Sequence, residues 1–147
     1  GLRVSEFVHL KKDTIFVDQG YGWVRSGKGG KDRLFIIPAN LRSRLVDYIN
    51  SHQSIWVFPG SKHSHYSPRS IGMIIKKAAK NAGIVKRVSP HTLRHSFATH
   101  LVEDGYDVMT VQVLLGHASP ATSMVYTHMA TPTLLKVTSP FDTLTTQ

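Results

Sequence analysis

A serine–proline pair stands at the start of three predicted helices in the part of the chain from residue 67 onwards and limits the fold more than any other feature: Ser67-Pro68, Ser89-Pro90 and Ser119-Pro120. Serine at the N-cap accepts a hydrogen bond from a free backbone N–H, and proline fits the first helical position, where no N–H is needed. An apolar helix also precedes Gly116, which we expect to be its left-handed C-terminal cap. The predicted helices are 67–82, 89–104, 108–115 and 119–126. This part of the chain is therefore mainly helical.

The preceding part combines a small sheet with two helices. Three β-rich runs alternate with glycine-containing turns: 14–18, 22–25 and 33–37. Such runs predict a three-stranded antiparallel meander. Glycines in the second turn permit positive φ angles, so Lys28 is expected at its tip. Helices are predicted at 4–10 and 39–52. The expected fold class is α+β, mostly α-helical with a small three-stranded antiparallel β-sheet.

Composition indicates a basic globular domain that binds a polyanion. With 147 residues, 41% of them hydrophobic, the chain is long enough for one domain with a single core. Its formal net charge is +9, and nucleic acid is the commonest partner of such a chain. An acidic lipid surface is the alternative, but the sequence has no basic amphipathic helix of the membrane-binding kind. It also has no apolar run of about 18 residues and no signal peptide, so we expect a cytoplasmic protein.

Metal and cysteine chemistry are not expected. The absence of cysteine excludes disulfides, thiolate zinc sites and cysteine nucleophiles. His63 and His65 share a polar loop, but they have no carboxylate or thiol partner nearby in the sequence. His91 and His95 have the spacing of a helical zinc pair, but Thr92 occupies the place of the glutamate in HExxH proteases. We therefore expect neither a metal nor a cofactor.

The helix that begins at Ser89 carries a candidate anion site. His91 and Arg94 are three residues apart, so they share one face close to a positively polarised helix N-terminus. This arrangement favours a phosphate, although solvated or capping side chains are the simpler interpretation of the pair alone. Taken alone, His117 is an ordinary loop residue and Tyr126 an ordinary packing residue.

The order and spacing of these residues resemble the catalytic C-terminal domain of tyrosine recombinases, the phage integrase family. The matching strings are HTLRHSFATHL, LLGH and MVYTH, joined upstream by GLRVSE and by GKGGKDR in the predicted hairpin. The resemblance extends from Gly1 to about His128. It implies six catalytic residues: Arg3, Lys28, His91, Arg94, His117 and Tyr126. Glu6 is implied as a supporting residue that orients this set.

The resemblance implies a reaction on DNA that uses neither a metal nor ATP. Arg3 and Arg94 would bind the scissile phosphate, and Tyr126 would attack it to give a 3′-phosphotyrosyl intermediate. His91 would take part in proton transfer, and Lys28 would protonate the leaving 5′-oxygen. Strand exchange and religation would follow. Without DNA, we expect the Lys28 turn and the Tyr126 region to be mobile or displaced.

The implied substrate is double-stranded DNA carrying specific recombination sites. We predict the following DNA-binding residues: Lys31, Arg33, Arg69, Lys76, Lys77, Lys80, Lys86 and Arg87. Two alternatives from other classes are a non-catalytic basic DNA-binding module and a metal-dependent nuclease. Covalent capture of DNA distinguishes the first alternative from a recombinase, and sensitivity to EDTA distinguishes the second.

The resemblance also predicts how the protein is divided and assembled. Because Gly1 falls inside a motif, we expect residues 1–147 to be an amino-terminally truncated catalytic domain without its core-binding domain. A homotetramer on DNA is implied for the full-length protein, with the 130–147 tail as a possible protomer contact. We expect the fragment alone to be monomeric, and the full-length protein to be associated with the bacterial nucleoid. The 91–117 stretch and the SPFDTL tail resemble integron integrases, but the short 57–89 region leaves Xer-like and mobile-element recombinases open.

Overall fold

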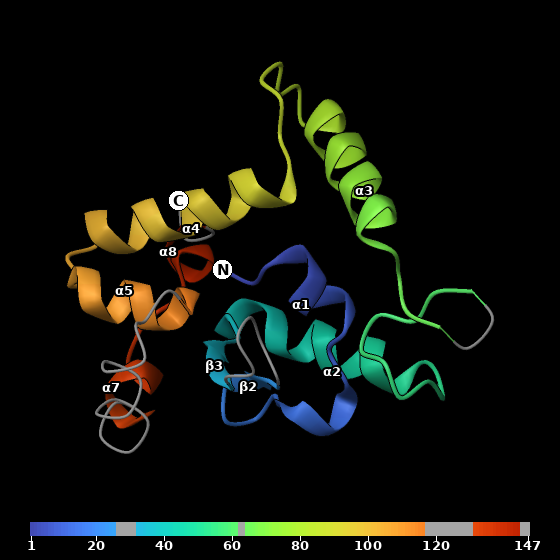
Figure 1. Cartoon of the computed structure of the whole chain (residues 1–147), viewed down its shortest axis with the longest axis horizontal. Coiled ribbons are helices and arrows are strands. Elements are labelled where there is room, and N and C mark those ends of the chain that lie inside the picture. The colour runs from blue at the N-terminus through green and yellow to red at the C-terminus, as the bar shows by residue number, and fades with distance from the viewer. Residues whose placement is uncertain (26–31, 62–63, 117–130, 145–147) are drawn as a thin grey trace.

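The computed structural model describes residues 1–25, 32–61, 64–116 and 131–144. The helices are α1 (Val4–Val8), α2 (Arg42–Asn50), α3 (Pro68–Asn81), α4 (Pro90–Glu103), α5 (Val108–Leu115), α7 (Thr131–Leu135) and α8 (Pro140–Leu144), with 3₁₀ turns η1 (Lys12–Thr14) and η2 (Ala39–Leu41). The strands are β1 (Ile15–Phe16), β2 (Tyr21–Val24) and β3 (Arg33–Ile36). Figure 1 shows the sheet and α2 in one half of the molecule, with α4 and α3 diverging above them. The predicted α+β fold, mostly helical with a small sheet, is confirmed.

The sheet is an antiparallel meander in the order β1-β2-β3. Tyr21 pairs with Ile36 and Val24 with Arg33, so β2 and β3 run side by side over their whole lengths. Strand β1 is shorter than the predicted 14–18 segment, because a 3₁₀ turn occupies its start and a tight turn closes directly after it. Gly20 makes that turn possible with a φ of 78°.

The helix starts follow the local chemistry of their caps. The Ser67 hydroxyl accepts a hydrogen bond from the Ser70 N–H at 3.0 Å, with proline at the first position of α3. At α4, Ser89 and Thr92 form a reciprocal capping box, with both hydrogen bonds at 3.2 Å. The predicted left-handed cap of α5 is confirmed, because Gly116 has a φ of 67°. The predicted 119–126 helix lies outside the described residues.

The main core joins α4, α5, β3 and the tail. Leu101 has no exposed surface, and Leu114 is 2% exposed. Leu134 and Val137 of the tail belong to the same apolar cluster. The tail is also held by polar contacts, because the two carboxylate oxygens of Asp142 each accept a hydrogen bond of 2.9 Å from a backbone N–H at the start of η2. The described part of the tail therefore packs on its own chain, and a contact with another protomer stays a prediction.

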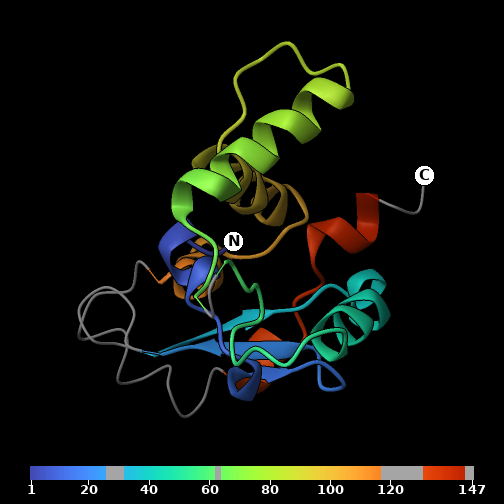
Figure 2. The ribbon, with the colours of Figure 1, turned by 90° about the vertical axis from the view of Figure 1, so that its right-hand side faces the viewer.

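Helix α3 carries an apolar stripe at helical spacing, but the structure buries little of it; the stripe consists of Ile71, Ile74, Ile75 and Ala78. None of its residues is buried, and Met73 and Ile74 are 57% and 50% exposed. Figure 2 shows α3 crossing the top of the molecule, clear of the sheet. Helix α4 buries Leu101 completely, but Leu93 is 51% exposed, because the first turns of α4 extend beyond α5 (Figure 1). No helix in the described ranges is long and apolar enough to span a membrane.

Candidate functional site

The first helix fixes one arginine of the site. Arg3 is the N-cap of α1, and the carboxylate of Glu6 accepts hydrogen bonds from the Arg3 backbone N–H at 2.6 Å and from the Arg3 guanidinium at 2.7 Å. These two bonds, both donated by Arg3 to Glu6, tie the direction of the Arg3 side chain to the start of the helix. The Arg3 side chain is 26% exposed, so part of the guanidinium faces solvent.

Arg94 reaches the same carboxylate from α4. Its side chain is 8% exposed, and its Nη1 lies 3.9 Å from an oxygen of Glu6. The guanidinium also donates to the carbonyl oxygens of Gly1, at 2.6 Å, and Leu115, at 2.5 Å. The convergence of Arg3 and Arg94 expected from the sequence is therefore present, and Glu6 lies between them in the supporting position.

Arg33 is a third arginine of this group, contrary to expectation. The sequence predicted a surface contact with DNA, but Arg33 is only 9% exposed. Its Nε lies 3.3 Å from one oxygen of Glu6, its Nη2 forms an ion pair with the other, and its Nη1 donates to the Leu114 carbonyl. This position does not favour the predicted contact of Arg33 with a DNA phosphate, because the guanidinium is engaged inside the protein. We call Arg3, Arg33, Arg94 and Glu6 the arginine cluster.

The C-terminus of α5 holds the arginine cluster together. The three consecutive carbonyls of residues 114–116 accept hydrogen bonds from Arg33, Arg94 and Arg3, in that order. Carbonyls in the last turn of a helix have no partner within the helix and carry its partial negative charge. Their pairing with three guanidiniums therefore satisfies the helix end and fixes the directions of the arginines.

Gly116 is required for this close approach. Its φ of 67° favours glycine, and a Cβ at this position would lie 2.6 Å from Cδ and 3.1 Å from Nε of Arg33. Any side chain would therefore displace Arg33 as well as disfavour the backbone conformation. The glycine of the LLGH string was assigned only a helix-ending role from the sequence, and the contact with Arg33 was missed because the two residues are far apart along the chain.

The net charge of the arginine cluster is positive, and this favours the binding of an anion. Burial on its own would raise the pKa of Glu6, but hydrogen bonds from Arg33 and from the Arg3 backbone and side chain outweigh it and lower that pKa to about 2. Burial, and then the charges of Arg3 and Arg33, lower the pKa of Arg94 to about 10 while Glu6 opposes them. At neutral pH three guanidinium charges face one carboxylate charge, so two positive charges remain for a ligand.

His91 lies in the first turn of α4, one turn before Arg94, and is exposed. The capping box at Ser89 sets the direction of that turn. An exposed imidazole is free to exchange a proton with a bound substrate. Four predicted functional residues lie outside the described residues: Lys28, Lys31, His117 and Tyr126. Arg25 precedes the 26–31 segment that contains Lys28, and Asp32 follows that segment. The two residues form an ion pair of 2.5 Å.

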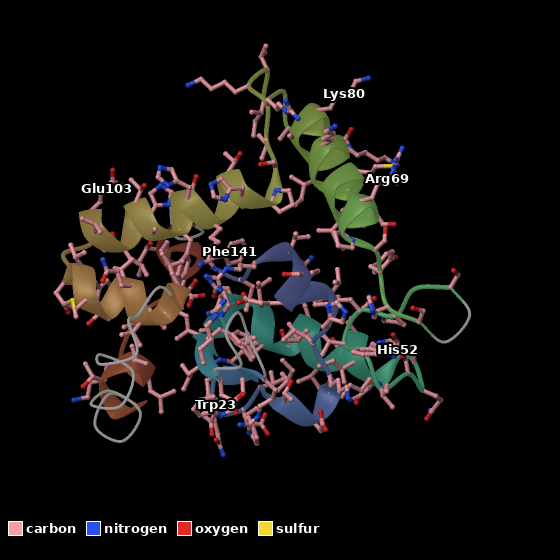
Figure 3. All side chains as sticks on the ribbon, in the orientation of Figure 1. Trp23, His52, Arg69, Lys80, Glu103 and Phe141 are labelled. Atoms are coloured by element: carbon pink, nitrogen blue, oxygen red, sulfur yellow. The ribbon has the colours of Figure 1, made fainter. Side chains whose placement is uncertain are left out.

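A basic arm follows α3 and the link to α4. Its exposed residues are Arg69, Lys76, Lys77, Lys80, Lys86 and Arg87. Figure 3 shows Arg69 and Lys80 projecting from α3 on the side away from α4. A cleft of about 480 Å³ at the end of the arm is lined by lysines and by Ile84 and Val85, which are 50% and 101% exposed. The residues of α3 that were predicted to bind DNA are thus at the surface, and their contact with DNA stays a prediction.

Nothing in the described part of the chain suggests a metal site, since no three His, Asp or Glu side chains there gather into one. His65 packs instead against the rings of His9 and Trp56. His63 lies outside the described residues. The arginine cluster can hold an anion by itself, because its donors are permanently charged at neutral pH.

The chain is similar to known recombinases in sequence and in fold. The phage integrase family model matches residues 1–132. The tyrosine recombinase XerA of Pyrococcus furiosus is 42% identical over 134 residues, which cover 88% of this chain and 46% of that protein. The crystal structure of XerA recombinase matches with a TM-score of 0.73 and 36% identity over 90% of this chain and 50% of that one. XerH site-specific recombinase bound to its difH substrate before cleavage has a TM-score of 0.69 and 28% identity over 89% of this chain and 40% of that one.

The chain spans about half the length of the curated relatives that it matches. Within that span, the family match covers all four residues of the arginine cluster and the last turn of α5. Fold, cluster and sequence similarity agree, and the chain therefore belongs to the phage integrase family, the tyrosine recombinases.

Proposed function

We propose that this chain is the catalytic domain of a site-specific DNA recombinase that cuts and rejoins DNA through Tyr126. The observation that carries the proposal is the arginine cluster, in which Arg3 and Arg94 meet on one carboxylate. A phosphodiester is an anion that repels a nucleophile, so it must be neutralised before attack. Guanidiniums do this with planar donors, and fixed donors stabilise the charge that grows on the phosphate in the transition state.

The exposed part of the Arg3 guanidinium is the natural contact for a non-bridging phosphate oxygen. Arg94 and Arg33 are more buried and are bonded to backbone carbonyls, so they contribute mainly a fixed positive field around that contact. Glu6 keeps both catalytic arginines in place and remains ionised, because its pKa is about 2. In this proposal Arg33 is a positioning residue and does not touch DNA.

The chemical step exchanges one phosphoester for another. A tyrosine has an ordinary pKa near 10, so only about one in a thousand is ionised at pH 7, and a base must accept its proton. His91 is the proposed acceptor. The Tyr126 oxygen then bonds to phosphorus as the bond from phosphorus to the 5′-oxygen breaks, and Lys28 protonates the leaving oxygen. His117 donates a further hydrogen bond to the phosphate.

The product is a 3′-phosphotyrosyl intermediate and a free 5′-hydroxyl. A 5′-hydroxyl from a second DNA duplex attacks this intermediate, releases the tyrosine and completes strand exchange. The number of phosphoester bonds does not change, so the step consumes no ATP. The arginines supply the electrostatic stabilisation that a metal ion provides in other phosphoryl-transfer sites.

Substrate and assembly follow from the same proposal. The substrate is double-stranded DNA with specific recombination sites, and the basic arm supplies phosphate contacts outside the active site. Four protomers of the full-length protein assemble on DNA at the nucleoid, and the 130–147 tail is a possible contact between them. XerH site-specific recombinase has been crystallised bound to its difH substrate before cleavage and to a palindromic difH substrate after cleavage, which supports DNA as the partner here.

Covalent capture of DNA tests the proposal. The full-length protein is incubated with nicked duplexes that cover candidate sites beside its gene, so that a cut strand loses its short 5′-hydroxyl fragment and cannot be rejoined. A protein–DNA adduct that survives denaturation is expected for the wild type and not for Tyr126→Phe. A non-catalytic DNA-binding module gives affinity without the adduct, and a metal-dependent nuclease gives cleavage that EDTA abolishes. Either result overturns the proposal.

A further inference from the structure

A second cleft lies beside Arg3, and the mechanism above does not use it. Its volume is about 740 Å³, within the range of small-ligand sites, and its lining comes from α1, η1, β2 and the link after α2. It contains Trp23 and Trp56, which are the two tryptophans of the chain. We call this site the tryptophan cleft and define it by Arg3, His9, Lys11, Trp23, Arg25 and Trp56.

Each tryptophan carries a cation over its ring. The guanidinium carbon of Arg25 lies 5.2 Å from the centre of the Trp23 ring, and the Lys11 ammonium nitrogen lies 5.5 Å from the centre of the Trp56 ring. Arg25 is additionally paired with Asp32, which holds it beside the sheet. The cleft thus repeats one unit, a flat ring with a positive group, on two different segments of the chain.

The Trp56 side of the cleft is built before any ligand arrives. Backbone hydrogen bonds of 2.9 Å on either side of Trp56, from Lys12 to Ile55 and from Val57 to Leu10, pair its segment with the chain after α1. The His65 ring meets Trp56 edge-on at 4.9 Å between centroids, and the His9 ring does so at 6.2 Å. A ring fixed by its backbone and by two neighbours is a preorganised stacking surface.

Charge in the cleft is mixed, and this decides the kind of ligand. Arg3, Lys11 and Arg25 are positive, whereas Glu6 and Asp13 are negative. Glu6 is paired with Arg3 and Arg33, but Asp13 is exposed and repels a simple anion. A ligand that fits both rings and cations needs flat faces as well as negative charge. Nucleotides have both, and aromatic stacking with basic side chains is how proteins hold single-stranded DNA.

We infer that the tryptophan cleft binds unpaired nucleotides of the DNA strand that continues from the phosphate at Arg3. This inference rests on the proposed function, because strand exchange must release one cut strand from its complement. Bases inside a duplex have both faces covered by their neighbours, whereas unpaired bases can stack on an indole ring. Arg3 lines both the cleft and the arginine cluster, so a strand leaves one site directly at the entrance of the other.

Tryptophan fluorescence tests the inference, because both tryptophans of residues 1–147 line the cleft, and the part of the quenching that they report should be smaller in Trp56→Leu. A short single-stranded oligothymidylate is expected to quench the emission of the full-length protein on titration, and the same sequence in a blunt duplex is expected to quench it much less. Trp56→Leu should weaken binding of a labelled oligothymidylate roughly five- to 150-fold, measured by anisotropy, because stacking on an aromatic ring is lost. Lys11→Ala should weaken it a few-fold, and the exposed Lys136→Ala, outside the cleft, should not change it.

Separate readouts keep the inference apart from the proposed function. An adduct with nicked duplex DNA together with unchanged oligothymidylate affinity in Trp56→Leu and Lys11→Ala overturns the cleft and leaves recombination standing. The opposite result is also informative. If oligothymidylate quenches the wild type and both variants weaken this effect, but the wild type forms no adduct, the cleft is supported as a single-strand site and recombination is refuted. Circular dichroism melting of each variant shows whether it is folded. If Trp56→Leu is unfolded, the binding measurement with Lys11→Ala decides the test.

Discussion

The arginine cluster and the basic arm of α3 are both positively charged, but they are built in opposite ways. In the cluster, Arg33 and Arg94 are 9% and 8% exposed, and carbonyls of α5 fix their guanidiniums. On the arm, Lys76, Lys77 and Lys80 are exposed on a helix without buried residues. Charged groups that are fixed and shielded from water stabilise a transition state without having to reorient during the reaction. Solvated charge attracts DNA at long range and is screened by salt.

The largest effect is expected at Arg94. Arg94→Ala should lower the rate of adduct formation by about a thousandfold or more, since it removes a fixed charge beside the phosphate and leaves the Leu115 carbonyl without its donor. Single-turnover cleavage at saturating DNA measures this. DNA affinity should fall much less than the rate, because the arm is intact. If affinity and rate fall by the same factor, the cluster acts only in binding and the contrast with the arm is wrong.

Arg94→Lys separates charge from geometry. Lysine keeps the positive charge but cannot donate along two directions from a planar group, as Arg94 does to Gly1 and Leu115. We expect it to restore little of the lost cleavage rate. A rate close to that of the wild type would show that charge alone is sufficient in the cluster, as it is on the arm.

A smaller effect on stability is expected at Glu6. Its pKa is lowered from 4.5 to about 2, so its contribution to stability is complete above pH 4.5 and is lost as the pH falls through 2. The shift corresponds to roughly 3 kcal/mol. Glu6→Gln should be destabilised at pH 7 by about 3 to 5 kcal/mol, because buried arginines lose their counter-charge, and should lose less stability than the wild type between pH 4.5 and 2. Urea denaturation at several pH values measures both changes.

Glu103→Gln is the matched control for Glu6. Glu103 is an exposed glutamate in the last turn of α4 (Figure 3), so its substitution should change stability by less than about 0.5 kcal/mol. Equal pH profiles for Glu6→Gln and the wild type would contradict the role assigned to Glu6 in the cluster.

Gly116→Ala is expected to show an intermediate effect on stability and on cleavage. An alanine at a φ of 67° is disfavoured by about 1 kcal/mol, and its Cβ would meet Arg33 at 2.6 Å. Gly105→Ala is the matched control, because Gly105 has a φ of 87° and open space around its Cβ position. Thermal melting should show a loss for both variants, larger for Gly116→Ala, and only Gly116→Ala should slow adduct formation. Equal behaviour of the two variants would remove the argument that this glycine makes room for Arg33.

These contrasts also show what the sequence can and cannot predict. The starts of α3 and α4 were predictable because Ser67 and Ser89 bond to backbone within the same turn. Arg33 was not, because its neighbours GKGGK resemble an exposed hairpin, and its burial depends on α5, which comes far later in the chain. For the same reason the sequence does not show that Leu93 is exposed beyond the end of α5. Residues whose partners are distant in sequence were predicted only through the family resemblance, as for Arg3 and Arg94.

The smallest effect per residue is expected on the arm. Each phosphate contact contributes a slope of about −0.9 when the logarithm of affinity is plotted against the logarithm of salt concentration. Replacing Lys76, Lys77 and Lys80 with alanine should therefore reduce the magnitude of the slope by up to about three and weaken DNA binding only a few-fold per residue at moderate salt. Lys136→Ala, which lies outside the arm, should leave the slope unchanged. The arm attracts DNA but does not stabilise the transition state, so the cleavage rate at saturating DNA should stay the same. A large loss of that rate would show that α3 helps to shape the catalytic site.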